Sequence, residues 1–293
     1  MNAPRAIRRQ SVGAVLTEAW QLTVAGLFTA FPFVLAAEII GALPVAGAGG
    51  GLLDTDLGRL GQPAYLGWVL CAAFVQALLY AYAVLRLAQL DTVRVAAPLR
   101  AALSATPTLL IAYLAYQLLI VFGLGFAVIL LLPVALLFGL IPGLVAILIP
   151  LAPTAWVSTA LAFFVYPAVL EQQGPFASLG RSFRLAKSNW GHAALIVSVP
   201  AIALLCVTVL QDAPTALQSL HNIMAGMSQL SSRPTAGQLQ GLLSSLDAHQ
   251  AVHQHPIWQA FTVLLSALAW WYAVAVCYAG FKMLKSAPSV TGQ

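Results

Sequence analysis

Apolar runs long enough to cross a lipid bilayer recur along this sequence, and this feature most restricts its fold. A helix needs about 20 apolar residues to span a hydrocarbon core of about 30 Å. We count six such runs, at about 23–43, 65–88, 108–131, 144–170, 193–211 and 257–281. Only 7% of the 293 residues are charged, against about 25% in an average soluble domain. The sequence therefore predicts an all-α, polytopic membrane helix bundle with six transmembrane helices, forming a single integral membrane domain over 1–293.

The distribution of lysine and arginine predicts the orientation of these helices. With the N-terminus in the cytoplasm, 11 of the 13 basic residues fall on the cytoplasmic side, and only Arg59 and Arg233 lie outside. Cytoplasmic loops carry such an excess, so both termini are expected to be cytoplasmic. The larger outer segment, 212–256, has leucine and methionine at helical spacing and is predicted to be a helical extracytoplasmic loop.

Residues 108–170 contain no charged side chain over a length that could hold two spans or three. Three spans would place Arg181, Arg184 and Lys187 outside, against the charge rule, so we predict two. Prolines and glycines interrupt 131–153, and whether this stretch re-enters the membrane stays open.

The stretch between Pro175 and Gly191 predicts a short amphipathic helix. Proline suits a first helical position and glycine suits a C-terminal cap. At about 100° per residue, one stripe contains Phe176, Leu179, Phe183, Ala186 and Trp190, and the other side carries Arg181, Arg184 and Lys187. That arrangement is typical of a helix resting in the headgroup layer. We expect it to contact anionic lipids on the cytoplasmic face; the alternative is a helix packed on a soluble partner.

Similar short amphipathic segments at 12–20 and 97–107 precede the first and third spans. Aligned on Leu16, Leu103 and Leu179, each segment has a small residue three places on, namely Ala19, Thr106 and Ser182. The starts are separated by 87 and then 76 residues. This pattern predicts a threefold internal repeat of one interfacial helix and two spans.

Few side chains are candidates for chemistry. Glu38 lies within the first span and is a candidate proton or cation site, although it could also reach the headgroups. Gln76 and Gln117 are polar residues within spans, for which interhelical hydrogen bonds are the simpler role. Glu171 follows Pro167 at the end of the fourth span. We expect Glu171 to pair with Arg181 or Arg184 and to fix the amphipathic helix there, rather than to act on a substrate.

No catalytic, cofactor or metal-binding motif is present, so we predict no enzymatic activity, no cofactor and no metal site. His249 and His253 are four apart and could share a helical face, but Pro256 soon interrupts that segment. Cys71, Cys206 and Cys277 are widely separated in apolar runs and are expected to pack as small apolar residues.

The stretch YPAVLE, the following Gly-Pro turn and ASLGRSFRLAKSNWG resemble the signature of a bacterial family of six-span inner-membrane proteins of unknown function. They are also similar to the membrane domain of some glycerophosphodiester phosphodiesterases. The matching positions are Pro167, Glu171, Leu179, Arg181, Ser182, Lys187 and Trp190. The resemblance implies a multi-pass protein of the bacterial inner membrane. It implies no phosphodiesterase activity, because no soluble region of domain size remains for that domain.

Three hypotheses of function follow. The first is a non-enzymatic protein of envelope or lipid organisation, or a partner of another membrane protein. The alternative is a transporter or channel for a small or amphiphilic solute, with Glu38, Gln76 and Gln117 as the candidate residues of its pathway. A membrane-embedded enzyme would require Asp91, Glu171 and His192 to come together. The short clusters of basic residues between apolar runs do not suggest nucleic acid as a partner.

Overall fold

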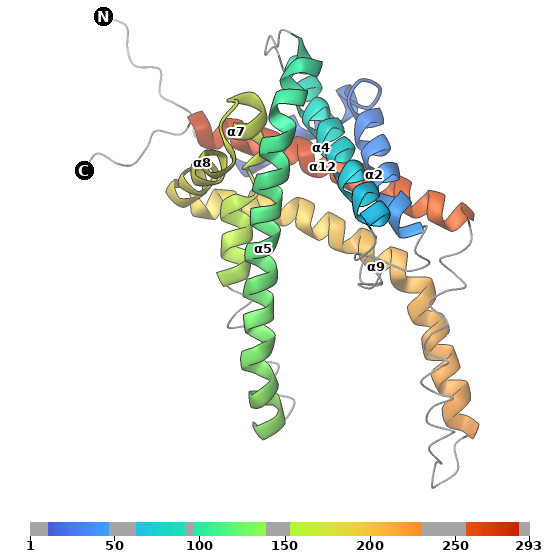
Figure 1. Ribbon diagram of the computed structural model, residues 1–293. Helices are drawn as coiled ribbons and strands as arrows, with labels where there is room; N and C mark the ends of the chain where they lie inside the picture. Colours follow the sequence, from blue (N-terminus) through green and yellow to red (C-terminus); the bar gives the residue numbers. More distant parts are fainter. Residues whose placement is uncertain (1–10, 47–62, 92–96, 139–152, 230–255, 287–293) are drawn as a thin grey trace, which may run out of the picture.

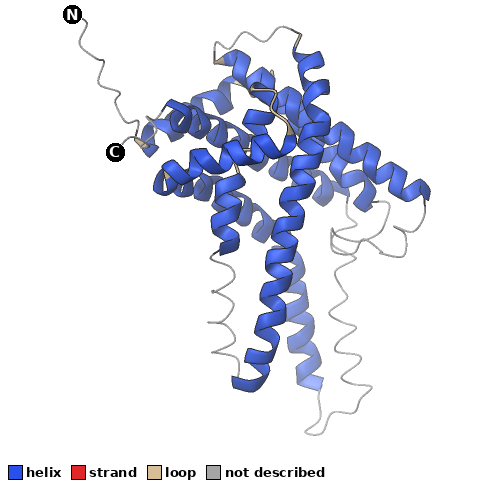
Figure 2. Ribbon diagram, turned by 60° about the vertical axis from the view of Figure 1, so that its left-hand side comes forward, coloured by secondary structure: helices blue, strands red, loops and turns tan. Residues whose placement is uncertain are grey.

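The computed structural model describes residues 11–46, 63–91, 97–138, 153–229 and 256–286. These parts are helical and contain no strand (Figure 2). The helices are α1 (Val12–Ala25), α2 (Phe31–Ala46), α4 (Pro63–Leu90), α5 (Pro98–Phe138), α7 (Val165–Leu170), α8 (Pro175–Ser188), α9 (Trp190–Gln229) and α12 (Pro256–Ser286). A further helix over 153–161 precedes α7. The predicted all-α helix bundle is confirmed.

Five stretches of helix are long and apolar enough to cross a membrane: Tyr65–Leu90, Pro98–Phe122, Pro153–Leu170, Trp190–Gln211 and Ala260–Ser286. They coincide with five of the predicted spans. The predicted first span corresponds to a shorter apolar helix, Phe31–Gly41, so the count of six stays a prediction. Large apolar side chains such as Phe28, Leu114 and Phe122 are exposed on the outside, as expected of a surface covered by lipid.

The boundary between the first amphipathic segment and the first span differs from the prediction. A turn over 26–30 separates α1 from α2, inside the stretch predicted as one span. Trp271 of α12 fills this bend, because a Cβ on Gly26 would lie 2.4 Å from its Cζ2 atom. The indole Nε1 of Trp271 donates a hydrogen bond to the carbonyl of Thr23 at 3.0 Å. A distant side chain therefore determines where α1 ends.

The second amphipathic segment does not form a separate helix. It continues without a break into the third span as α5, although Pro107 and Pro133 lie within that helix. Neighbouring helices and side chains can satisfy the backbone groups that a proline frees in a membrane helix. Because α5 reaches Phe138, the stretch 131–138 is helical, and 139–152 lies outside the described residues.

The first part of the predicted outer loop continues the helix of the fifth span. The helix α9 runs to Gln229 and passes through Pro214. The remainder of that loop, 230–255, which includes His249 and His253, lies outside the described residues. Figure 1 shows the lower ends of α5 and α9 extending beyond the rest of the bundle.

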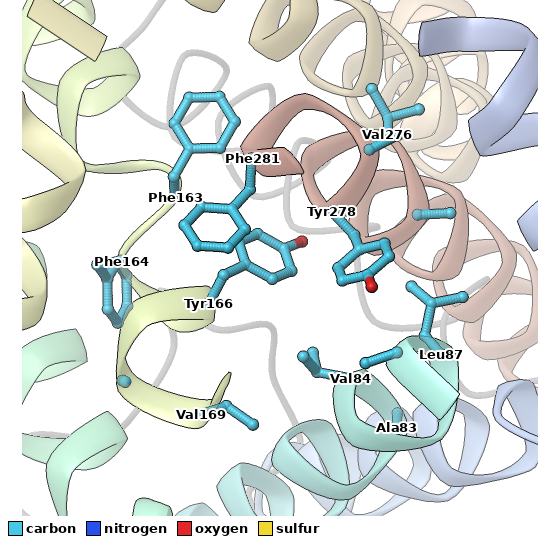
Figure 3. Packing of buried hydrophobic residues seen from close by; sticks show 14 of the residues in the cluster. Ala83, Val84, Leu87, Phe163, Phe164, Tyr166, Val169, Val276, Tyr278 and Phe281 are labelled. Carbon is cyan, nitrogen blue, oxygen red and sulfur yellow. The ribbon is translucent and has the colours of Figure 1, made fainter. Parts of the chain in front are cut away.

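The core of the bundle is organised around α12, which packs against α1, α2, α8 and α9 (Figure 1). The ring of Tyr166 in α7 stacks on Phe281 with centroids 5.4 Å apart, and Tyr278 lies beside it at 5.9 Å (Figure 3). The Tyr166 hydroxyl donates to the carbonyl of Val274 at 2.8 Å. The end of the predicted fourth span is therefore anchored on α12.

The three amphipathic segments bury equivalent positions. The alignment predicted from sequence gives three equivalent positions in the three segments. They are Val15, Ala102 and Ser178 at the first position, Ala19, Thr106 and Ser182 at the second, and Leu22, Leu109 and Leu185 at the third. No side chain among these nine is more than 8% exposed. The shared spacing of four and then three residues, with leucine always last, supports the predicted repeat.

Candidate functional site

The amphipathic helix α8 begins at Pro175 after an extended Gly174, as predicted. Its buried face coincides only in part with the predicted apolar stripe. Ser178, Ser182, Leu185 and Ala186 are buried. Leu179, Phe183 and Trp190 of the stripe are partly buried against the core, whereas Phe176 is 73% exposed. Small hydroxyl side chains allow α8 to approach its neighbours closely, and this close packing rotates the helix away from the predicted orientation.

The side chain of Ser182 bridges a turn at 162–164, where the helix over 153–161 is interrupted before α7 begins. Its hydroxyl donates to the carbonyl of Ala160 at 2.8 Å and accepts from the N–H of Phe163 at 3.1 Å. Pro167 lies in the first turn of α7, where a missing N–H costs no helical hydrogen bond. The repeat identified Ser182 only as a small residue, and nothing in its spacing indicated that it would bond to the backbone of another helix.

An aromatic cluster fixes the other end of α8. Trp156, on the helix over 153–161, lies edge-on to Phe183 with centroids 5.3 Å apart and contacts Trp190 at 5.7 Å. Such pairs contribute about 0.5–1.5 kcal/mol beyond their burial. The predicted surface residue Trp190 is therefore half-buried against protein. Together with Ser182, these contacts hold α8 in one orientation.

Glu171 pairs with Arg181, as one of the two predicted alternatives states, with Nε and Oε2 3.7 Å apart. Its stronger contact is with Lys285, whose Nζ lies 2.7 Å from Oε1. Gln173 also donates to Oε2 at 2.9 Å. Sequence reasoning missed Lys285, because it lies on α12, far along the chain. The pairing joins the α7–α8 corner to the end of α12.

A second set of ion pairs lies one turn away on α12. Lys282 contacts Glu18 of α1 at 2.6 Å and Asp91, directly after α4, at 2.5 Å. The Tyr278 hydroxyl also donates to Asp91 at 3.1 Å. We call the six charged residues Glu18, Asp91, Glu171, Arg181, Lys282 and Lys285 the charged cluster. It contains three carboxylates and three cations, which balance.

Two cations of α8 remain outside the charged cluster. Arg184 and Lys187 are exposed, and neither has a carboxylate partner in the part of the chain that the structure describes. Arg184 thus does not take the alternative pairing with Glu171. The exposed side of α8 therefore carries two positive charges without a carboxylate partner among the described residues, and the ring of Phe176 is exposed in its first turn.

Glu38 does not point away from the bundle. Its Oε1 accepts a hydrogen bond from the Tyr80 hydroxyl of α4 at 2.5 Å, and its Oε2 accepts one from Ser266 of α12 at 2.9 Å. The carboxamide of Gln76 lies one turn from Tyr80 and packs on Gly41, where a Cβ would be 2.6 Å from Nε2. We call Glu38, Gln76, Tyr80 and Ser266 the polar junction.

Gln117 is separate from the polar junction. Its Nε2 donates to the hydroxyl of Tyr113 at 2.6 Å, one turn back on α5. This hydrogen bond lies within one helix, and among the described residues Gln117 does not form the interhelical bond expected from sequence.

The residues required for a membrane-embedded enzyme are not assembled into one site. Asp91 is engaged by Lys282 and Glu171 by Lys285, and within the described residues neither carboxylate forms an ion pair with His192. Within the described ranges, no three His, Cys, Asp or Glu side chains lie close enough together to hold a metal ion. Comparison with protein-family models, with curated proteins and with solved structures found no match.

Proposed function

We propose that this chain is a non-enzymatic, multi-pass protein of the bacterial inner membrane whose α8 binds anionic lipid at the cytoplasmic surface. Its role would be in envelope or lipid organisation, or as the partner of another membrane protein. The observation that carries the proposal is the pair of exposed cations Arg184 and Lys187 on a helix that is fixed in place.

The charged cluster supports the proposed topology. The ion pairs join positions 18, 91, 171, 181, 282 and 285. If these residues lie at one membrane surface, the chain between Glu18 and Asp91, between Asp91 and Glu171, and between Arg181 and Lys282 must cross an even number of times. Between Glu18 and Asp91, α4 needs a partner, for which α2 is the apolar helix. In the next interval α5 pairs with the stretch ending at Leu170, and in the last α9 pairs with α12. Six crossings satisfy all three intervals.

The chemistry of α8 supports an anionic headgroup as ligand. Each Lys or Arg near an anionic membrane surface contributes about 1 kcal/mol of attraction. Arg181 is already paired with Glu171, so Arg184 and Lys187 are the side chains available to phosphate. The exposed ring of Phe176, in the first turn of the same helix, can enter the acyl boundary. A fixed helix pays little ordering entropy on binding lipid.

The proposal is tested by counting bound lipids. The protein and its double variant Arg184→Gln/Lys187→Gln are placed in nanodiscs of phosphatidylglycerol and phosphatidylethanolamine, released, and analysed by native mass spectrometry. We expect the variant to lose most of its retained phosphatidylglycerol. Arg86→Gln is the control, because its guanidinium is already bonded to Gln89 at 3.0 Å and should retain the lipid. Equal phosphatidylglycerol retention by the double variant would contradict the proposal.

A further inference from the structure

Glu38 differs from every other carboxylate whose side chain the structure describes. Glu18, Asp91 and Glu171 each form an ion pair with lysine or arginine. Glu38 has no such pair within the described ranges, and the groups that contact it are the hydroxyls of Tyr80 and Ser266. An ionised carboxylate without a cation is costly inside a membrane, so a position of this kind implies a use.

The geometry of the polar junction fits both protonation states of Glu38. When ionised, the carboxylate accepts one hydrogen bond at each oxygen, from Tyr80 and from Ser266. When protonated at Oε2, its O–H can donate to the Ser266 hydroxyl, because a serine oxygen both donates and accepts. Tyr80 continues to donate to Oε1. A proton can therefore be gained or lost without any heavy atom changing place.

The junction also offers a polar group beside the carboxylate. The carboxamide of Gln76 has no hydrogen-bond partner among the residues that the structure describes, and it lies against Gly41, three residues from Glu38. Neither Glu38 nor Gln76 is fully buried. An amide without a partner is free to hydrogen-bond a water molecule, and water can deliver a proton to a carboxylate.

We propose that the polar junction is a reversible proton-binding site, in which Glu38 binds the proton, Tyr80 and Ser266 hold the carboxylate, and Gln76 positions the water that exchanges it. In the forward step, one proton from water forms an O–H bond on Oε2 and cancels one negative charge. The reverse step restores the carboxylate. Because α2, α4 and α12 meet at Glu38, each step changes the charge between three helices.

The test is infrared difference spectroscopy of the full-length protein in liposomes, recorded as the pH is lowered and raised. We expect a protonated-carboxyl band that appears reversibly in the wild type and is lost in Glu38→Gln. Both hydroxyls are hydrogen-bonded to the carboxyl group. In Tyr80→Phe and Ser266→Ala the band should therefore remain but change frequency.

Two control variants separate the proton site from other effects. Gln117→Leu removes a polar side chain outside the junction and should leave the Glu38 band unchanged. Glu171→Gln should remove a different carboxyl signal, since its carboxylate is held by Lys285. The proposal is overturned if Glu38→Gln loses no band. If Glu38→Gln does not fold, an unchanged band in both Tyr80→Phe and Ser266→Ala overturns it instead. These outcomes do not depend on whether α8 binds lipid.

Discussion

The hydroxyl of Ser182 pairs two backbone groups that the break at 162–164 leaves without helical partners. Removing one partner of a buried hydrogen bond costs about 1–3 kcal/mol per group left unsatisfied. We expect Ser182→Ala to lower the free energy of unfolding by an amount in this range, measured by reversible denaturation in mixed micelles. Ser178 is equally buried, but its hydroxyl donates only to Pro175 within α8. Ser178→Ala should therefore cost clearly less, and equal losses would contradict the bridging role.

At the level of helical elements, Lys282 and Lys285 provide a matched pair on α12. Each lies over an aromatic ring, at 5.8 Å from Tyr278 and 5.7 Å from Phe281. They differ in whether the carboxylates that they contact keep another cation when the lysine is removed. Lys282 is the cation shared by Glu18 and Asp91, whereas Glu171 would keep Arg181 if Lys285 were lost.

We therefore expect Lys282→Met to destabilise the protein more than Lys285→Met, by about 1 kcal/mol after allowing for the partial exposure of both lysines. The measurement is the free energy of unfolding in micelles at low salt. Since salt screens exposed charges, the difference between the two variants should narrow at high salt. A larger loss for Lys285→Met would show that α12 is fixed mainly through α7 and α8, and would contradict the expectation.

The helices α1, α5 and α8 show which structural features could be predicted from the sequence. The start of α8 was predictable because proline, glycine and helical periodicity are local signals. The break between α1 and α2 was not, because Trp271 sets it from a distant helix. The unbroken course of α5 through Pro107 was not predictable either, since a proline favours a helix boundary unless other groups satisfy the backbone. The pairing of Glu171 with Arg181 follows from proximity in sequence, whereas its contact with Lys285 depends on the whole fold.

Across the whole molecule, two independent observations support the predicted repeat of one interfacial helix and two spans. The charged cluster joins the C-terminal ends of α4, α7 and α12 with α1 and α8, and the buried positions of the three amphipathic segments follow one spacing. The observed helix boundaries do not repeat: α1 ends at a turn, α5 is continuous, and α8 is separated from α9 by Asn189. What the three segments share is therefore the face that packs inward. Packing can persist while helix ends change, because each boundary depends on local contacts such as Trp271 and Ser182.

The repeat makes a quantitative prediction across the chain. Leu22, Leu109 and Leu185 occupy the third buried position in the three segments. Replacing a buried leucine by alanine costs about 2–5 kcal/mol through lost contacts and the cavity left behind. We expect all three leucine-to-alanine variants to lower the free energy of unfolding by comparable amounts in that range.

The control is the leucine six residues earlier in each segment, namely Leu16, Leu103 or Leu179. These side chains are only partly buried or exposed, so their replacement leaves little or no cavity and each should cost less than its buried partner. The measurement compares six unfolding curves recorded in the same micelles. A segment in which the two leucines gave equal losses would not share the packing of the others. Because each buried leucine is compared with one on its own helix, differences in overall stability between segments do not affect the result.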